Sequence, residues 1–526
     1  MAKTTISEAQ VDYQLKAVID LGSTSIRMVV AQVREDGTIQ PLEILNQSVS
    51  IGSDTFSRGR ISRSTISDAV KTLRNFASLL GEYNIDLNRD VRAVATSAVR
   101  EARNRDEFID RVYISTGVNI EVIEGTEVNR LTFLAIQPVL ESNAALRKNR
   151  LLVAEVGGGS TELLGLDDAR VSFAHTYRMG AYRLQETMQE QRGSEARQRE
   201  TLSMEVEATV RQCRDAAGRD TEKVSLLLMG GEARFAARQL LKGWSDEQLG
   251  CVKLIDLRAL ADKILALDVE RIARKHRLML EEAQTLGPAL MAYVKLAEAF
   301  KLKQIFICGV SLRDGLLAEA ATGGSWSEDF VEQILHSARE VGKRFSLDQA
   351  HADCVTALSI ELYRAMESEH RLSARYEVIL TVAAQLHDVG MFIGSSSHHK
   401  HSKYIIENSD IFGLGEEDIR LTALVARYHR GAAPRATHPG YDALQREERL
   451  IVNKLAAILR AADALDRSHT QAVKNLKIAV DEDQVVIEIG RAGEYTAEKR
   501  AMVVKGKLFE QVYGRVIALR AKRRQG

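Results

Sequence analysis

The sequence predicts an α/β protein whose N-terminal part consists of two similar halves, followed by a helical domain and a small α+β segment. Two units of strand, glycine turn and strand, around Gly22 and Gly157, lie about one domain length apart. The chain has 526 residues, more than one hydrophobic core usually holds. We therefore expect domains over residues 1–140, 141–322, 323–470 and 471–526.

The first half begins with two apolar strands joined by a short turn. Residues Lys16–Asp20 and Ile26–Val33 are rich in β-branched side chains, and Gly22 lies in the polar segment between them. Apolar residues then recur at helical spacing over Ser64–Tyr83. The other elements expected in this half are strands at Asp90–Ala95 and Glu121–Ile123 and a helix at Glu127–Leu140.

The second half repeats this beginning. An apolar strand at Leu151–Val156 runs into the Gly157–Thr161 turn, and a second apolar strand follows at Glu162–Leu166. We interpret the repeat as a duplication of architecture in which the two glycine turns face each other. Further strands are expected at Val224–Met229 and Gln304–Cys308, and helices at Ser194–Ala217 and Leu257–His276.

The C-terminal part of the chain begins with a linker and is then predicted to be mainly helical. The segment Ala321–Trp326 is small and polar, which is typical of a linker, and helical patterning extends from Ser327 to about Ala462. Strands are expected at Leu476–Val480 and Gln484–Ile489. The basic tail Arg520–Arg524 is typical of a solvated terminus.

The composition excludes several classes of protein. Hydrophobic residues make up 45% and charged residues 27%, as in soluble globular domains and unlike fibrous or disordered chains. Lys+Arg and Asp+Glu number 72 each, which argues against a sequence-specific nucleic-acid-binding protein or a membrane-surface protein. The apolar stretches are too short for a membrane span, and the four cysteines match no disulfide or metal-site spacing. We expect a cytoplasmic protein.

Acidic residues accompany both glycine turns. The backbone N–H groups of such turns can converge on an anion, and neighbouring Ser and Thr hydroxyls add donors. Asp20, Glu155 and Glu162 could hold a magnesium ion against a phosphate chain that both turns grip. The alternatives are ordinary β-hairpins for the turns, and capping or surface charge for the carboxylates. The phosphate-binding candidates are Gly22, Ser23, Thr24, Gly157, Gly158, Gly159, Ser160 and Thr161.

Several segments, in order along the chain, carry a resemblance to a known family. They are Ala17–Val30, Ala95–Asn104, Val122–Glu127, Gly157–Leu163 and Leu312–Leu317. They resemble the motifs of the exopolyphosphatase/guanosine-pentaphosphate phosphatase family, which belongs to the actin and sugar-kinase superfamily. The resemblance covers roughly residues 15–320 and implies two actin-like (RNase H-like) α/β domains.

The resemblance also implies an activity. This is hydrolysis of a terminal phosphoanhydride bond of inorganic polyphosphate or guanosine pentaphosphate, with a divalent metal (Mg²⁺, or else Mn²⁺), in a homodimer. The family's catalytic acid falls on Glu127, where it would deprotonate the attacking water with a pKa raised by partial burial among phosphates. A phosphate-binding arginine falls on Arg100. The alternatives are stabilisation of a helix N-terminus by Glu127 and a surface position for Arg100.

Some positions depart from the family pattern. The family usually has Asp at the position of Glu155, Asn is common at the position of Thr24, and Val128 replaces Glu beside the proposed base. These changes leave open a catalytically weakened regulator that binds polyphosphate. An ATP-using enzyme is also open, because Leu226–Gly231 resembles the glycine turn that holds adenosine in the superfamily.

The histidine-rich C-terminal region resembles the helical histidine–aspartate (HD-type) domain of longer family members. The candidate metal ligands are His351, His387, Asp388 and Asp463. They follow the ligand order of metal-dependent phosphohydrolases, and imidazole with carboxylate suits divalent metals. Further histidines at His398–His401 and His429 could extend a second metal site or an anion site. The alternative is an exposed polar loop or a structural network. The resemblance implies an accessory domain that lengthens the anion channel or supports the dimer.

Overall fold

The computed structural model describes residues 13–34, 36–190, 195–216, 224–321, 326–474, 476–489 and 495–521. The chain divides into two compact units, Met1–Ser325 and Trp326–Gly526. Most of the linker expected at Ala321–Trp326 lies outside the described residues. Among the described residues, no helix combines the length and the apolar character needed to cross a membrane.

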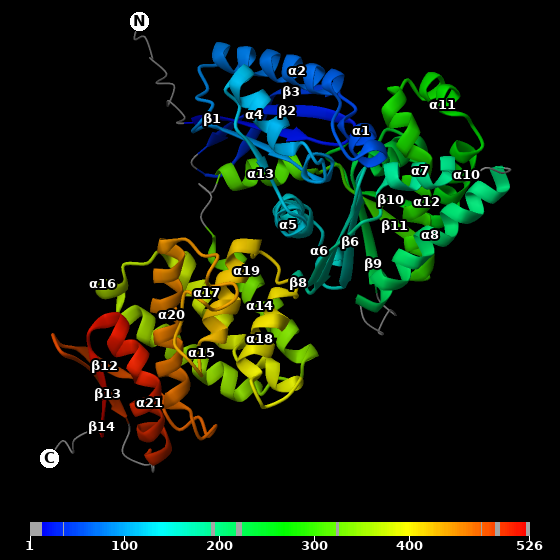
Figure 1. Ribbon diagram of the computed structural model, residues 1–526. Coiled ribbons are helices and arrows are strands. Elements are labelled where there is room, and N and C mark those ends of the chain that lie inside the picture. Colours follow the sequence, from blue (N-terminus) through cyan, green and yellow to red (C-terminus); the bar gives the residue numbers. More distant parts are fainter. Residues whose placement is uncertain are drawn as a thin grey trace, which may run out of the picture. The chain divides into compact units, whose positions relative to one another are not determined.

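The first sheet of the N-terminal unit has the strand order β3-β2-β1-β4-β5 (Figure 1). Its strands are β1 (Tyr13–Leu21), β2 (Ser25–Arg34), β3 (Ile39–Ser48), β4 (Val91–Ala95) and β5 (Ile120–Val122). β1, β2 and β3 are antiparallel, whereas β4 and β5 run parallel to β1. The sheet is buried on both faces, since Ile19 belongs to one core cluster and its neighbour Val18 to another.

The second sheet repeats this topology and adds one strand. Its order is β10-β11-β9-β6-β7-β8. The strands are β6 (Arg150–Val156), β7 (Thr161–Asp167), β8 (Arg170–Tyr177), β9 (Val224–Met229), β10 (Gly250–Lys253) and β11 (Gln304–Ile307). β6, β7 and β8 are antiparallel, and β9 and β11 follow in parallel on the other side of β6. The predicted duplication and the α/β fold class are confirmed.

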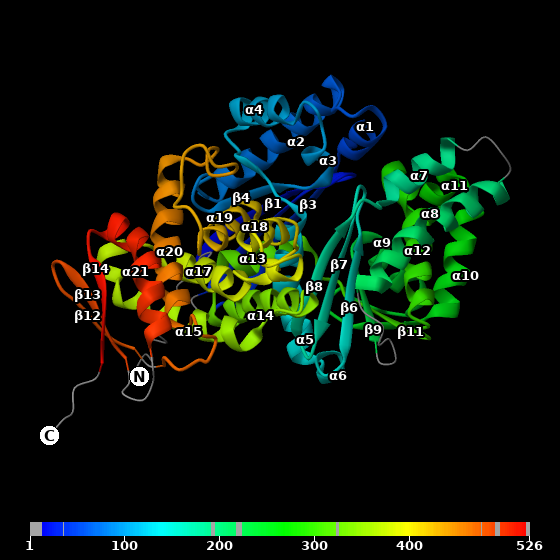
Figure 2. The ribbon, with the colours of Figure 1, turned by 60° about the horizontal axis from the view of Figure 1, so that its bottom comes forward.

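Helices cover both faces of the second sheet (Figures 1 and 2). α9 and α12 pack on one face, where α8 and α10 pack against α12, and α5 packs on β7 and β8. The helices of the N-terminal unit are α1 (Ile51–Arg58), α2 (Arg63–Glu82), α3 (Ser97–Arg100), α4 (Arg105–Thr116), α5 (Gly125–Ser142), α6 (Ala144–Arg147), α7 (Ala181–Glu190), α8 (Glu195–Ala216), α9 (Gly231–Leu240), α10 (Leu254–Leu265), α11 (Val269–His276), α12 (Leu280–Ala299) and α13 (Leu312–Ala321).

The single helix expected at Leu257–His276 is wrong. The structure divides this segment between α10 and α11. The Asp268 carboxylate accepts a hydrogen bond from the Arg271 backbone N–H at 2.8 Å, and this N-cap begins a new helix.

The C-terminal unit is mainly helical, as predicted. Its helices are α14 (Glu328–Arg344), α15 (Gln349–Ala365), α16 (Glu367–His370), α17 (Ala374–Leu386), η1 (Val389–Phe392), α18 (His398–Glu407), α19 (Glu416–Arg427), α20 (Arg446–Leu465) and α21 (Thr496–Tyr513). The strands β12 (Lys477–Val480), β13 (Gln484–Ile489) and β14 (Val516–Ala521) form a small sheet. α21 packs along α20, so the last α+β segment and the helices share one unit.

Gly180 fixes the second glycine turn in place. A Cβ atom at this position would lie 2.3 Å from the carbonyl oxygen of Gly158, which is backbone and has little freedom to move. Directly after Gly180, the Ala181 N–H donates to the Gly157 carbonyl at 2.8 Å. The start of α7 therefore packs on the backbone of the turn, and this packing requires glycine.

We expect Gly180→Ala to destabilise the N-terminal unit by on the order of 2 kcal/mol, because the added methyl group displaces the turn backbone. Gly81→Ala in α2 is the matched control. Nothing lies within 4 Å of its Cβ position, and alanine favours a helix over glycine by up to about 1 kcal/mol. Calorimetric unfolding of both full-length variants checks this. Equal midpoints would contradict the packing argument.

Candidate active site

The two glycine turns share one hydrogen-bond geometry. The Gly22 N–H donates to the Ser25 carbonyl at 3.0 Å, and the Gly157 N–H donates to the Ser160 carbonyl at 2.8 Å. Each bond closes a hairpin, between β1 and β2 in one case and between β6 and β7 in the other. The duplication thus extends to individual backbone contacts.

The two turns also face each other, as the sequence predicts. A Cβ atom at Gly158 would lie 2.4 Å from both Cβ and Oγ of Ser23, so the turns of the two halves are in contact. They line one cavity of about 760 Å³. The predicted site residues that line it are Asp20, Gly22, Ser23, Thr24, Glu155, Gly157, Gly158, Ser160 and Glu162.

Four of the site residues predicted for the N-terminal unit lie outside this lining. They are Arg100, Glu127, Gly159 and Thr161. The Arg100 guanidinium donates to the Ile123 carbonyl at 2.6 Å, and the Thr161 hydroxyl donates to the Met179 carbonyl. These side-chain donors are therefore engaged within the protein.

Glu127 is held in an ion-pair network at the start of α5. Its carboxylate accepts hydrogen bonds from Arg130 at 2.7 Å and from Arg92 at 3.0 Å, and both arginines also contact Glu319. Burial raises the pKa of Glu127, but the hydrogen bonds and charges of the two arginines outweigh burial, so its pKa is lowered. In the ligand-free protein, the pKa of Glu127 thus differs in direction from the rise expected among bound phosphates, and that rise stays a prediction. The next residue, Val128, lines the cavity, because successive helical residues point in different directions.

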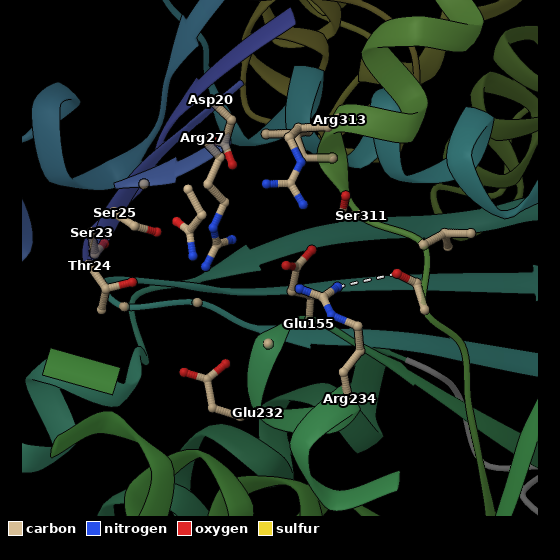
Figure 3. A pocket seen from close by; sticks show the side chains of 18 of the residues that line it. Asp20, Ser23, Thr24, Ser25, Arg27, Glu155, Glu232, Arg234, Ser311 and Arg313 are labelled. Carbon is tan, nitrogen blue, oxygen red and sulfur yellow. Dashed lines mark hydrogen bonds between the residues drawn. The ribbon is translucent and has the colours of Figure 1, made fainter. Parts of the chain in front are cut away.

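Three arginines that sequence reasoning did not single out extend into the cavity. Figure 3 shows Arg27, Arg234 and Arg313 around Glu155; they come from β2, α9 and α13, respectively. Burial lowers the pKa of Arg313, and the charges of Arg27 and Arg234 lower it further against the opposing effect of Asp20. Three guanidinium groups with few protein acceptors suit the oxygens of a polyphosphate chain.

The sequence alone could have identified one of these arginines as a site residue. Arg27 is the cross-strand partner of Asp20 in the β1–β2 hairpin, so the hairpin register places it at the mouth of the first turn. Arg234 and Arg313 follow other strands of the second half, β9 and β11. Their approach to this site depends on how the sheet assembles.

Carboxylates meet in the same cavity. Burial raises the pKa of Glu155 to about 7, and the charges of Glu162, Asp20 and Glu232 contribute to this rise against Arg234. Burial also raises the pKa of Glu162, although a hydrogen bond from Ser160 at 2.6 Å opposes it. Buried carboxylates that repel one another are stabilised by a cation, and an all-oxygen donor set suits Mg²⁺ or Mn²⁺. The donor chemistry of the predicted ligands thus suits a metal, but Asp20, Glu155 and Glu162 do not form a group whose ligand atoms all lie within 4.8 Å of one another, so their joint role stays a prediction.

Tyr293 fixes the backbone behind Glu155. Its buried hydroxyl donates to the Met229 carbonyl at 2.8 Å and accepts from the Val156 N–H at 3.1 Å. It therefore joins the ends of β6 and β9, from which Glu155 and the Gly230–Gly231 turn enter the site.

Comparison with known proteins agrees with this geometry. The Ppx/GppA phosphatase family matches residues 29–322, and domain III of Ppx/GppA phosphatases matches residues 335–504. The chain belongs to the Ppx/GppA phosphatase family. A relative from Aeromonas hydrophila named guanosine-5'-triphosphate,3'-diphosphate pyrophosphatase is 26% identical over 492 residues, covering 90% of this chain and 92% of the relative.

Two further relatives extend the comparison. A protein of the same name from Aliivibrio fischeri is 24% identical and covers 84% of this chain and 86% of its own length. A solved structure described as an exopolyphosphatase-like protein has a TM-score of 0.51 and 25% identity. It covers 59% of this chain and 98% of its own. Membership of a phosphatase family agrees with a cavity lined by two glycine turns and three arginines.

The predicted metal ligands of the C-terminal unit are brought together. His351, His387 and Asp463 each offer a ligand atom within 4.8 Å of the others, and Asp388 lies beside His387. The Nε2 atoms of His351 and His387 are buried without a hydrogen-bond partner. Burial lowers the pKa of His387 to about 4, which keeps its imidazole neutral and able to bind metal. The donors therefore fit a divalent metal ion.

The raised pKa of Glu155 makes stability depend on pH. The folded protein binds the proton of Glu155 more tightly than the unfolded chain, so this contribution is complete below pH 4.5 and is lost as pH rises to about 7. In metal-free protein, we expect Glu155→Gln to become more stable than the wild type over this range, by on the order of 3 kcal/mol. Urea unfolding at several pH values checks this.

Glu107→Gln, which removes an exposed carboxylate from α4, is the control and is expected to leave the pH profile unchanged. Addition of Mg²⁺ at pH 8 should stabilise the wild type more than Glu155→Gln. If the free energy of unfolding changed with pH in the same way for the wild type and Glu155→Gln, ionisation of Glu155 would not destabilise the folded protein.

Proposed function

We propose that this protein binds the phosphate chain of guanosine pentaphosphate or inorganic polyphosphate in the cavity and hydrolyses the terminal phosphoanhydride bond. The observation that carries this proposal is the gathering of two opposed glycine turns, three arginines and a carboxylate cluster around one space. In the reaction, a water oxygen bonds to the terminal phosphorus and the anhydride P–O bond breaks. Orthophosphate and the shortened chain leave, and the water gives up a proton.

The residues of the chain have separate tasks. Backbone N–H groups of the turns and the hydroxyls of Ser23 and Thr24 bind phosphate oxygens, and the arginines neutralise charge that develops on the transferred group. Asp20, Glu155 and Glu162 would hold a divalent metal, which supplies Lewis-acid stabilisation of the departing phosphate.

Guanosine pentaphosphate is the first substrate to test. Two curated relatives that align over most of this chain are both named for the hydrolysis of guanosine-5'-triphosphate,3'-diphosphate. The cavity also has apolar walls, including Phe235, Leu278 and Leu286, which could accommodate a nucleoside. Inorganic polyphosphate presents the same terminal anhydride and remains the alternative.

A second candidate function rests on the position of Glu127. Two arginines neutralise its carboxylate outside the cavity lining, and Val128 occupies the lining position beside it. A water in the cavity would therefore meet the apolar side chain of Val128, because the acid is on the preceding residue, Glu127, outside the lining. This arrangement supports a catalytically weakened protein that binds the phosphate chain and turns it over slowly.

The hydrolase proposal predicts a particular order of substrates. With Mg²⁺ present, we expect orthophosphate release from guanosine pentaphosphate and long-chain polyphosphate to exceed release from ATP. Arg313→Gln should reduce kcat/KM by about 10²-fold or more, because it removes a guanidinium that the phosphates contact. Arg63→Gln, at an exposed position of α2, is the control. Preferential turnover of ATP, or equal activity of the two variants, would contradict this proposal.

The regulator alternative predicts that a carboxylate at position 128 restores turnover. If the lining lacks a base, Val128→Glu should increase phosphate release by about 10²-fold, whereas Val128→Gln, of similar size, should not. Glu127→Gln should mainly lower thermal stability, because it leaves Arg92 and Arg130 with less compensation. Rapid wild-type turnover that Glu127→Gln abolishes would instead establish Glu127 as the base.

A further inference from the structure

One wall of the cavity in the N-terminal unit is formed by two packed helices that each contribute an apolar residue and a carboxylate. On α9 these residues are Phe235 and Glu232, one helical turn apart. On α12 they are Leu286 and Glu282, again one turn apart. α9 and α12 pack against each other, and the buried Phe235 ring meets the His276 ring edge to face at 5.1 Å. The wall therefore combines an apolar surface held in place by packing with two acidic groups.

The two carboxylates are oriented by single hydrogen bonds. The Thr285 hydroxyl donates to Oε1 of Glu232 at 3.0 Å, and the Met279 backbone N–H donates to Oε2 of Glu282 at 3.3 Å. Within the part of the chain that the structure describes, neither carboxylate forms an ion pair, and the second oxygen of each accepts no hydrogen bond. A ligand that enters the cavity therefore meets free acceptor oxygens beside an apolar wall.

This wall is unsuited to phosphates, because a carboxylate repels their negative charge. Figure 3 shows Glu232 pointing into the cavity from the side opposite Arg313. Glu232 also lies close enough to Glu155 for its charge to contribute to the raised pKa of Glu155. The phosphate chain is therefore expected beside the arginines, and the wall between α9 and α12 is left for a part of the ligand that is apolar and carries hydrogen-bond donors.

A nucleobase has this combination, and a carboxylate distinguishes one purine from the other. A carboxylate only accepts hydrogen bonds, so it selects a base by its donors. Guanine carries the N1–H group and the N2 amino group side by side, and the two oxygens of one carboxylate can accept from both. Adenine has a lone pair at N1, which a carboxylate repels. A site that hydrogen-bonds a substrate group rejects the analogue that lacks this group far more strongly than an apolar wall alone would.

We propose that Glu282 reads the guanine base of the nucleotide substrate, accepting hydrogen bonds from N1–H and the N2 amino group while Phe235 and Leu286 enclose the ring. Glu282 has this role because the lining residues Leu278 and Leu286 stand four positions before and after it, whereas Glu232 adjoins the carboxylates expected to hold the metal. The assignment rests on the function proposed above and deepens it, since it makes the cavity selective for guanosine over adenosine nucleotides.

The test compares phosphate release by the full-length protein from three substrates. They are guanosine pentaphosphate, its adenosine counterpart with the same five phosphates, and long-chain polyphosphate, which has no base. In the wild type, we expect kcat/KM for the guanosine form to exceed that for the adenosine form by about 10²-fold or more. Glu282→Gln should reduce this ratio by about 10-fold or more, because its amide sets N–H donors against those of guanine and matches N1 and N6 of adenine. Turnover of polyphosphate should be unchanged.

Glutamine is chosen because it keeps the local structure of α12. Its amide oxygen can still accept from the Met279 N–H, so the capping bond at the start of the helix is retained. Thermal unfolding of Glu282→Gln checks that the variant is folded. Glu270→Gln, which makes the same change at an exposed position of α11, is the control and should leave turnover of all three substrates unchanged.

Calorimetric binding of the product, guanosine tetraphosphate, with Mg²⁺ present, tests the base contact without turnover. The wild type should bind it about 10-fold or more tightly than its adenosine counterpart, and Glu282→Gln should lose this preference. Equal affinities in the wild type, or a Glu282→Gln effect of the same size on polyphosphate, would overturn the role of Glu282. Hydrolysis of polyphosphate alone would overturn it as well and leave the hydrolase intact. A guanine preference in binding without hydrolysis of any substrate would support Glu282 and contradict only the hydrolase.

Discussion

The close approach of two backbone turns governs the arrangement of the N-terminal unit. Gly158 packs on Ser23, and Gly180 packs on the carbonyl of Gly158, so the second turn is held between the first turn and the start of α7. Interiors are densely packed, so a side chain at Gly158 would push the two halves apart, and a side chain at Gly180 would displace the second turn. The two turns that touch at this point line the shared cavity.

Positive and negative side chains around the cavity compensate one another only in part, and this determines which ligands the cavity can bind. Arg27, Arg234 and Arg313 face Asp20 and Glu155 in a space that is partly withdrawn from water. Without a ligand, these groups compensate one another incompletely, as the raised pKa of Glu155 and the lowered pKa of Arg313 indicate. The proposed ligand, a phosphate chain with a divalent cation, would supply both missing partners.

Helix geometry decides which residue at the start of α5 reaches the cavity. Glu127 and Val128 are adjacent in α5, and a rotation of about 100° between successive residues directs only Val128 to the lining. Arg92 from β4 and Glu319 from α13 complete the network around Glu127. The sequence motif placed Glu127 at the start of this helix, whereas the ion pairs that hold its carboxylate depend on partners far away in the chain.

Much of this protein can be predicted from local sequence. Alternating apolar residues and glycine turns specified the two hairpins, their duplication and the helical C-terminal unit, because strands, turns and helices follow short-range patterns. The same patterns identified Asp20, Glu155 and Glu162 beside the turns. The Asp268 N-cap was a local signal as well, but it was hidden within a continuous apolar pattern.

Only the tertiary structure decided which distant groups meet. Arg234 and Arg313 reach Glu155 because parallel strands of one sheet end at the same edge, and this requires crossovers that no short segment encodes. In the C-terminal unit, the alignment of His398 with His429 depends on the packing of α18 against α19. Sequence fixes the chemical groups and their local direction, whereas long-range packing determines which of them share a site.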